Sequence, residues 1–191
     1  MNLSVKTLLV AASCLFASHS YALTINGGAT EVGDLDSIVA STNTLGNSGD
    51  ATELAWVESV LGLTSGSLGF GAKTEDTDTD WSWTQLDGPD YSTAYAFDLL
   101  TDPGYFLIKI GTGGLADANP EHFLYQNNQS NAFAVVDLLD LCPTCSSFNN
   151  FTIGRLSHIG EIGAASVPEP GTLALFGLGL LGLALGRKKI S

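Results

Sequence analysis

The sequence predicts a mainly β domain: an antiparallel β-sandwich or jelly-roll-like fold with one short N-terminal helix, flanked by a signal peptide and a C-terminal transmembrane helix. Three observations predict it. After Gly71, short alternating or apolar segments are separated by turn residues, a pattern typical of antiparallel sheets. One stretch before Gly71 has helical periodicity. Both ends of the chain are apolar, so we expect one domain, residues 23–166, between two processing segments.

Residues 1–22 have the features of a secretory signal peptide. Lys6 supplies a positive charge, residues 7–17 are mostly apolar, and Ser20-Tyr21-Ala22 places small residues at the −3 and −1 positions of a cleavage site. We therefore expect signal peptidase to cut after Ala22. Lipidation at Cys14 is an alternative, but no large aliphatic residue stands just before that cysteine.

A helix is predicted directly after Gly49. Asp50 and Glu53 have the spacing of a capping box, in which Glu53 reaches back to the start of the helix. Gly62 stands where a C′ glycine would end it. The expected apolar face consists of Leu54, Val57, Val60 and Leu61, with Trp56 at its edge.

Six strands are predicted after Gly71, each bounded by turn residues such as Gly88-Pro89-Asp90 and Asp102-Pro103-Gly104. At this spacing they indicate an antiparallel sandwich. The predicted strands are Trp81–Leu86, Thr93–Leu99, Tyr105–Ile110, His122–Gln126, Ala132–Leu139 and Thr152–Ile159.

The run from Glu75 to Asp80 carries a carboxylate at every second position. Such carboxylates converge on one calcium ion if the chain curls into a loop. Asp87 is twelfth when Asp76 is counted first, as in an EF-hand, but Trp81 replaces the glycine needed at the sixth position. The candidate calcium ligands are Asp76, Asp78, Asp80 and Asp87, and the alternative is a solvated acidic turn without any cofactor.

Cys142 and Cys145 remain after the signal peptide is removed, and outside the cytoplasm we expect them to form a structural disulfide. A redox CxxC site is the alternative, but no helix-forming segment follows it. Zinc would need two further ligands. His122 and His158 are the remaining histidines, and we expect both to be ordinary sheet residues.

The interior holds 19 acidic residues against three basic ones, Lys73, Lys109 and Arg155. This charge disfavours nucleic acid and anionic lipid as partners. No catalytic constellation is recognised, and the sequence cannot place two carboxylates at the separation that glycoside cleavage needs. An aromatic face stacking on sugars is one possible binding surface; it would consist of Trp81, Trp83, Tyr91, Tyr95 and Tyr105.

The C-terminal segment, residues 167–191, combines three features. Val167-Pro168-Glu169-Pro170 is an extended, protease-accessible motif. Residues 171–186 are apolar and long enough for about 24 Å of helix, a marginal membrane span. Arg187, Lys188 and Lys189 follow, and by the positive-inside rule they keep the C-terminus in the cytoplasm. A permanent single-span anchor is the alternative to a processed tail.

This segment resembles the PEP-CTERM sorting signal, which has the same three parts in the same order. The resemblance implies that an exosortase recognises residues 168–170 and cleaves nearby, in a bacterium with an extracellular polysaccharide matrix. We therefore expect a protein that is transiently anchored in the inner membrane, faces the periplasm, and then reaches the cell surface or matrix.

More weakly, residues 80–163 are similar to a β-rich passenger type that recurs in PEP-CTERM proteins without an assigned activity. The motifs are strand-like: residues 105–109, 123–127, 134–137 and 153–159. The functional expectation is a non-enzymatic surface or matrix protein associated with exopolysaccharide or biofilm. The alternatives are a secreted carbohydrate-active hydrolase and a calcium-dependent carbohydrate-binding module.

Overall fold

A computed structural model describes residues 22–46, 48–111, 120–129, 132–141 and 153–165. The predicted mainly β fold with antiparallel sheets and one helix is confirmed. In chain order the elements are β1 (Leu23–Ile25), β2 (Thr30–Gly33), β3 (Ser37–Thr42), α1 (Asp50–Leu61), β4 (Leu68–Glu75), β5 (Trp83–Gln85), η1 (Pro89–Tyr91), β6 (Ala94–Asp98), β7 (Tyr105–Ile110), β8 (His122–Gln126), β9 (Phe133–Asp137), η3 (Ile153–Arg155) and β10 (Leu156–Ala164).

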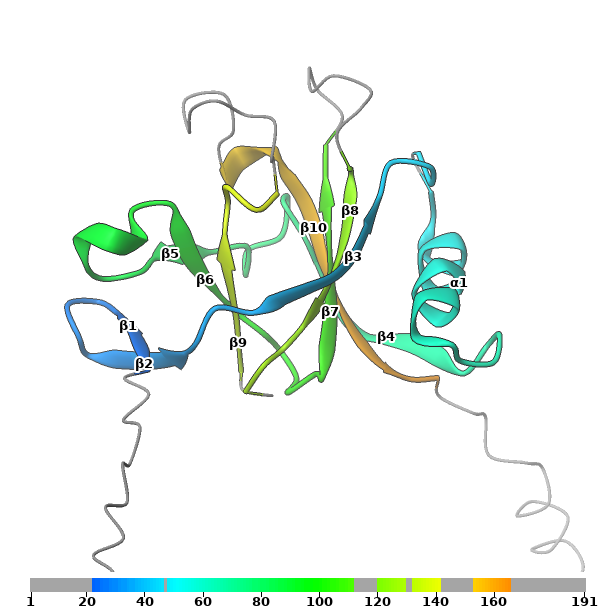
Figure 1. Cartoon of the computed structure of the whole chain (residues 1–191), viewed down its shortest axis with the longest axis horizontal. Helices are drawn as coiled ribbons and strands as arrows, with labels where there is room; N and C mark the ends of the chain where they lie inside the picture. The colour runs from blue at the N-terminus through cyan, green and yellow to red at the C-terminus, as the bar shows by residue number, and fades with distance from the viewer. Residues whose placement is uncertain (1–21, 47, 112–119, 130–131, 142–152, 166–191) are drawn as a thin grey trace, which may run out of the picture.

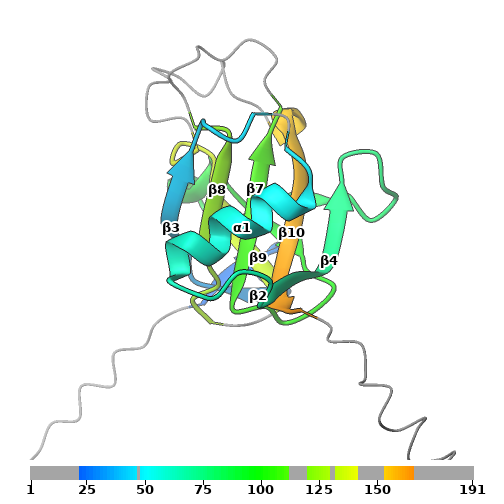
Figure 2. The same ribbon diagram turned by 90° about the vertical axis from the view of Figure 1, so that its right-hand side faces the viewer.

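The largest sheet is antiparallel and has the order β3-β8-β7-β10-β4. β10, the last of the described strands, lies inside it between β7 and β4, while β3 and β4 form its edges. Figure 2 shows this order from one side of the sheet to the other, with α1 crossing one face. The sheet is thus completed only by the C-terminal strand of the domain.

A smaller antiparallel sheet, β5-β6-β9, packs against the face that α1 leaves free. The two sheets share one apolar core, in which the rings of Phe106 and Tyr125 stack at 5.1 Å and Phe97 packs from β6. Burial of such a core is the main term that stabilises a sandwich. The expected sandwich arrangement of two antiparallel sheets is therefore present in the described residues.

The outer faces of both sheets are also covered. The β1-β2 hairpin packs on the smaller sheet through Ile25 and Val32, as Figure 1 shows at the left of the molecule. α1 packs on the larger sheet, with Val57 buried against Leu107 and Leu124. β7 and β8 consequently bury apolar residues on both of their faces. The described domain thus has four layers: the β1-β2 hairpin, the smaller sheet, the larger sheet and α1.

The predicted helix is confirmed at both ends and on its apolar face, but its cap is not the predicted one. Gly62 adopts the left-handed conformation at φ 66° and its N–H donates to the last turn, as a C′ glycine should. At the other end Gly49 is the N-cap, with no side-chain capping bond. Glu53 does not reach back, because its side chain enters the sheet instead.

The predicted and observed strand bounds agree best for β7 and β8, in which apolar residues follow one another along the strand. β7 and β8 have the predicted bounds, and β5, β6 and β9 lie within theirs. The last predicted strand begins too early, because Ile153–Arg155 forms a 3₁₀ turn, and it ends too early, because β10 continues to Ala164. β1 to β4 were not predicted. β4 and the end of β10 are rich in glycine, which weakens any strand signal.

Several predictions concern residues outside the described ranges. They are the signal peptide, of which residues 1–21 are not described, the pair Cys142 and Cys145, and the C-terminal segment from Ser166 onward. Among the residues that are described, no helix is both long and apolar enough to cross a membrane. The predicted disulfide and the predicted span over residues 171–186 therefore stay predictions.

Candidate functional site

Three polar side chains form one row across the helix-covered face of the larger sheet. Lys109 on β7 pairs in register with His122 on β8 and with His158 on β10. Alternation along β7 places Ile108 and Ile110 in the core between the sheets, so Lys109 points to the opposite face, toward α1. The row is therefore a direct product of strand register.

Glu53 enters the middle of this row from α1. Its Oε1 lies 3.4 Å from Lys109 Nζ and 3.3 Å from His122 Nε2, and its Oε2 lies 3.2 Å from His158 Nε2. Ser48, just before the helix, donates its hydroxyl to Glu53 Oε1 and accepts a hydrogen bond from Lys109 Nζ through its carbonyl. Glu53 and His122 are fully buried.

Burial alone would raise the pKa of Glu53, but its surroundings outweigh that effect. Hydrogen bonds from His122 and His158, together with the charges of His158 and Lys109, hold its pKa well below the ordinary value. Glu53 is thus a carboxylate at neutral pH. Besides the Ser48 hydroxyl, its two oxygens bind one side chain from each of three neighbouring strands, so Glu53 links the helix to β7, β8 and β10. We call Glu53, Lys109, His122 and His158 the Glu53 cluster.

The Glu53 cluster was not predicted from sequence. His122 and His158 were expected to be ordinary sheet residues, and Glu53 was assigned to a cap. One signal was available: Lys109 and His122 each stand at a position that alternation assigns to a sheet face otherwise apolar, next to Leu107 and Leu124. A buried cation on such a face requires a carboxylate partner, although the sequence does not say which one.

The four predicted calcium ligands do not come together. Asp87 accepts hydrogen bonds from the backbone N–H groups of Gly27 and Gly28 in the β1-β2 turn, and these bonds lower its pKa. Asp78 instead accepts from the Glu75 N–H within its own turn. In the described part of the chain, no three His, Cys, Asp or Glu side chains form a group that could hold a metal ion.

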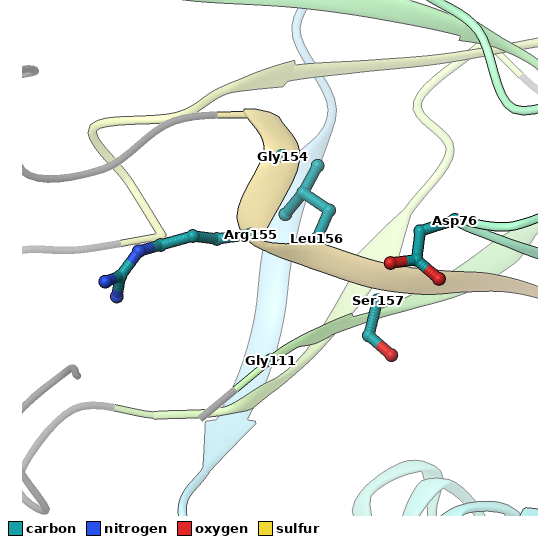
Figure 3. A pocket seen from close by; sticks show the side chains of 6 residues that line it. All are labelled: Asp76, Gly111, Gly154, Arg155, Leu156 and Ser157. Carbon is teal, nitrogen blue, oxygen red and sulfur yellow. The ribbon is translucent and has the colours of Figure 1, made fainter. Parts of the chain in front are cut away.

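An open polar pocket of about 240 Å³ lies where β4 ends and β10 begins. It is lined by Asp76, Gly111, Gly154, Arg155, Leu156 and Ser157. Figure 3 shows the side chains of Asp76 and Ser157 near each other along β10, with Arg155 extending away from both. The backbone is fixed here, because Asp76 N–H donates to Ser157 O at 2.9 Å and Gly111 N–H donates to Arg155 O at 2.7 Å.

The proposed sugar-stacking aromatic face does not form as one surface. Trp81 and Trp83 pack edge to face at 5.8 Å and both contact Phe97, against the core between the sheets. Tyr91 packs on the hairpin side, and Tyr105 packs beneath α1. The five aromatic side chains are therefore divided among three apolar clusters, and mainly serve packing.

A family model described as the PEP-CTERM protein-sorting motif matches residues 166–189. This confirms the sorting signal expected from the C-terminal segment. Comparison with curated proteins and with solved structures found no match. The motif lies entirely after the described domain, so the domain has to be interpreted from its own geometry.

Proposed function

We propose that this protein, which carries a PEP-CTERM sorting motif and is exported and sorted by an exosortase, is a non-enzymatic surface or matrix protein that associates with exopolysaccharide. The observation that supports this proposal most is the position of the polar pocket relative to the sorting motif. The motif begins directly after Ala165, the last described residue. The end of β10 therefore marks the membrane-proximal end of the domain.

The pocket lies at the opposite end of the sheet. β10 begins beside Ile110 and Glu75 and ends beside Tyr105 and Leu68. In Figures 1 and 2 the start of β10 lies at the top of the molecule and its end lies at the bottom. A domain tethered through its C-terminus thus presents the pocket and the turn from Asp76 to Asp80 away from the membrane, toward extracellular material.

The pocket offers groups that suit a sugar. A carboxylate, a hydroxyl and exposed glycine backbone provide acceptors and donors for neighbouring sugar hydroxyls, and hydrogen bonds to a charged group contribute about 1.5–3 kcal/mol each. By contrast, the chain's two described histidines are buried beneath α1 in the Glu53 cluster. In this proposal the two histidines hold α1 on the sheet and do not act on a substrate.

The route of delivery follows from the two ends of the sequence. Signal peptidase removes residues 1–22. Residues 171–186 then hold the domain at the periplasmic face of the inner membrane, with Arg187, Lys188 and Lys189 in the cytoplasm. Cleavage by the exosortase near residues 168–170 releases the domain to the cell surface or matrix.

Co-sedimentation of the exported protein with exopolysaccharide from the producing bacterium tests the proposal. Asp76→Ala should weaken binding about tenfold or more, because one charged hydrogen bond is lost. Asp102→Ala is the matched control: Asp102 is also an exposed aspartate, but it precedes β7 at the opposite end of the sheet. Equal binding by wild type and Asp76→Ala would contradict the assignment of the pocket.

The same assay separates the alternatives. Binding that is abolished by a chelator and restored by calcium would favour a calcium-dependent carbohydrate-binding module built on the acidic turn. Release of reducing sugar from the polysaccharide, abolished by one carboxylate substitution, would establish a hydrolase and overturn the non-enzymatic proposal.

A further inference from the structure

One basic side chain of the described domain has no counter-charge. Lys73 pairs with Asp50 at 2.7 Å, and Lys109 pairs with Glu53 at 3.4 Å. Arg155, the third basic residue in the described ranges, forms no ion pair there. Because the interior of the sequence holds 19 acidic residues, a shortage of carboxylates does not explain the missing partner.

The guanidinium group of Arg155 also lacks a hydrogen bond. Its Nη1 atom is buried and has no acceptor among the described residues, although the residue as a whole is only partly buried. A buried N–H group without an acceptor has lost its bonds to water and gained none in return. Arginine also stays charged in proteins. An anionic acceptor from outside the chain would therefore satisfy both the charge and the hydrogen bond.

Arg155 belongs to the lining of the polar pocket of about 240 Å³, together with Asp76 and Ser157. Its backbone is held in place, because the Gly111 N–H donates to its carbonyl at 2.7 Å. Figure 3 shows the side chain of Arg155 extending away from Asp76. The lining thus carries its negative charge toward one side and its positive charge toward the other.

We propose that this pocket takes a sugar that carries a carboxylate, a uronic acid unit of the exopolysaccharide, and that Arg155 binds the carboxylate. The inference rests on the proposed function and names the class of sugar. The planar guanidinium group presents parallel N–H donors that match the two oxygens of a carboxylate. Asp76 and Ser157 accept from and donate to the ring hydroxyls on the other side of the pocket.

The charge of the domain makes the pocket selective in two ways. With 19 acidic residues against three basic ones, the domain repels an anionic polymer over most of its surface. Arg155 is the described position at which an anionic group gains an unopposed positive partner. The carboxylate of Asp76 disfavours a second anion at its own side, so the acidic sugar binds in one orientation.

Co-sedimentation with two preparations of exopolysaccharide from the producing bacterium tests the proposal. One is the native polymer, and the other is the same polymer after chemical reduction of its carboxylates to primary alcohols. The exported, released protein should bind the native polymer about tenfold or more tightly than the reduced one, because one charged contact is lost. Arg155→Gln should bind both preparations alike. Arg155→Lys should keep part of the preference, because the charge remains but the planar pair of donors does not.

Lys73→Gln is the matched control. It changes the net charge by the same amount, but Lys73 pairs with Asp50 and does not line the pocket, so the preference should remain. Circular dichroism shows whether each variant is folded, and Arg155→Lys keeps the test valid if Arg155→Gln unfolds. The proposal is overturned if wild type binds both preparations equally, if folded Arg155→Gln retains the full preference, or if Lys73→Gln loses it. Reduction leaves sulfate and phosphate esters in place, so recognition of those groups would appear as equal binding.

Failure of this inference and failure of the proposed function give different results. If wild type binds both preparations equally and Asp76→Ala weakens both, the pocket binds polysaccharide without using a carboxylate, and only the acidic sugar is ruled out. If wild type sediments with neither preparation, the proposed function is wrong and this inference is wrong with it.

Discussion

Glu53 joins α1 to side chains on three strands of the larger sheet. We expect Glu53→Gln to lower the free energy of unfolding by about 3 kcal/mol or more, because it removes the negative charge that faces Lys109 inside the protein. Glutamine retains the size of the side chain, so the effect reports charge and hydrogen bonding. Urea unfolding measures it.

Asp50→Asn is the control for the loss of a helix carboxylate. Asp50 lies one turn earlier on α1 and pairs with Lys73, but its side chain is 58% exposed. Exposed pairs contribute about 0–1 kcal/mol. If the two substitutions destabilise the protein equally, burial of the Glu53 cluster does not determine its contribution.

Asp36 provides a prediction for pH dependence. It is buried where the chain passes between the sheets, and its two oxygens accept from the N–H groups of Asn128 and Val135. Burial raises its pKa to about 6 against the lowering effect of these two bonds. Because its pKa in the unfolded chain is 3.8, the unfolded chain loses this proton first as the pH rises. The stability contributed by Asp36 therefore falls between pH 4 and 6.

The size of this change follows from linkage: about 2 pKa units correspond to about 3 kcal/mol. Relative to Asp36→Asn, wild type should lose about that much stability between pH 4 and pH 7, as measured by urea unfolding at intervals across the range. Asp98→Asn gives the baseline for removal of an exposed carboxylate. Parallel curves for wild type and Asp36→Asn would show that Asp36 does not titrate in this window.

Among the elements, the packing of β10 against β4 depends on Gly160, which has no side chain. A Cβ added at Gly160 would lie 2.7 Å from Phe70 Cδ1 on β4, which is closer than real Cβ atoms approach. We expect Gly160→Ala to destabilise the domain by about 1–3 kcal/mol, because the ring of Phe70 has to move out of its place beneath α1. Thermal unfolding measures the change.

Gly163→Ala is the matched control on the same strand, since its nearest atoms would be 3.9 Å away, an ordinary contact. Adding Phe70→Ala should make the further Gly160→Ala substitution nearly neutral, because the clashing ring is gone. A full Gly160→Ala effect without the Phe70 ring would mean that the strain comes from the backbone of β10.

The sequence predicted elements better than the contacts between them. β7 and β8 were predictable because apolar residues extend along them without interruption, and α1 was predictable from its 3.6-residue period and Gly62. The role of Glu53 was not, because the spacing of a capping box is identical whether the side chain turns back or enters a sheet. Its partners lie 56, 69 and 105 residues further along the chain, and pattern alone does not encode such separations.

At the scale of the whole molecule, processing predicts the mass of the final product. Protein recovered outside the cell should begin at Leu23 and should lack the basic C-terminus, Arg187 to Ser191, because an exosortase removes the tail near residues 168–170. Intact-mass spectrometry of the exported protein measures both ends. As a control, Glu169→Ala in the motif should leave the protein in the membrane fraction at the larger mass. Extracellular protein that retains Arg187 would contradict processing.

The position of β10 also fixes the order of events during export. For a chain that crosses the membrane from its N-terminus, β4 and β7 arrive outside long before the strand that lies between them. β10 also brings Glu161, whose buried carboxylate accepts from the Leu100 and Thr101 N–H groups and so ties down the turn after β6. Only one residue separates its end from the matched sorting motif. Until translocation has almost finished, the sheet lacks the strand that joins β7 to its edge strand β4. The domain therefore completes its folding at about the moment its sorting motif reaches the membrane, so that maturation of the domain and access of the exosortase are coupled in time.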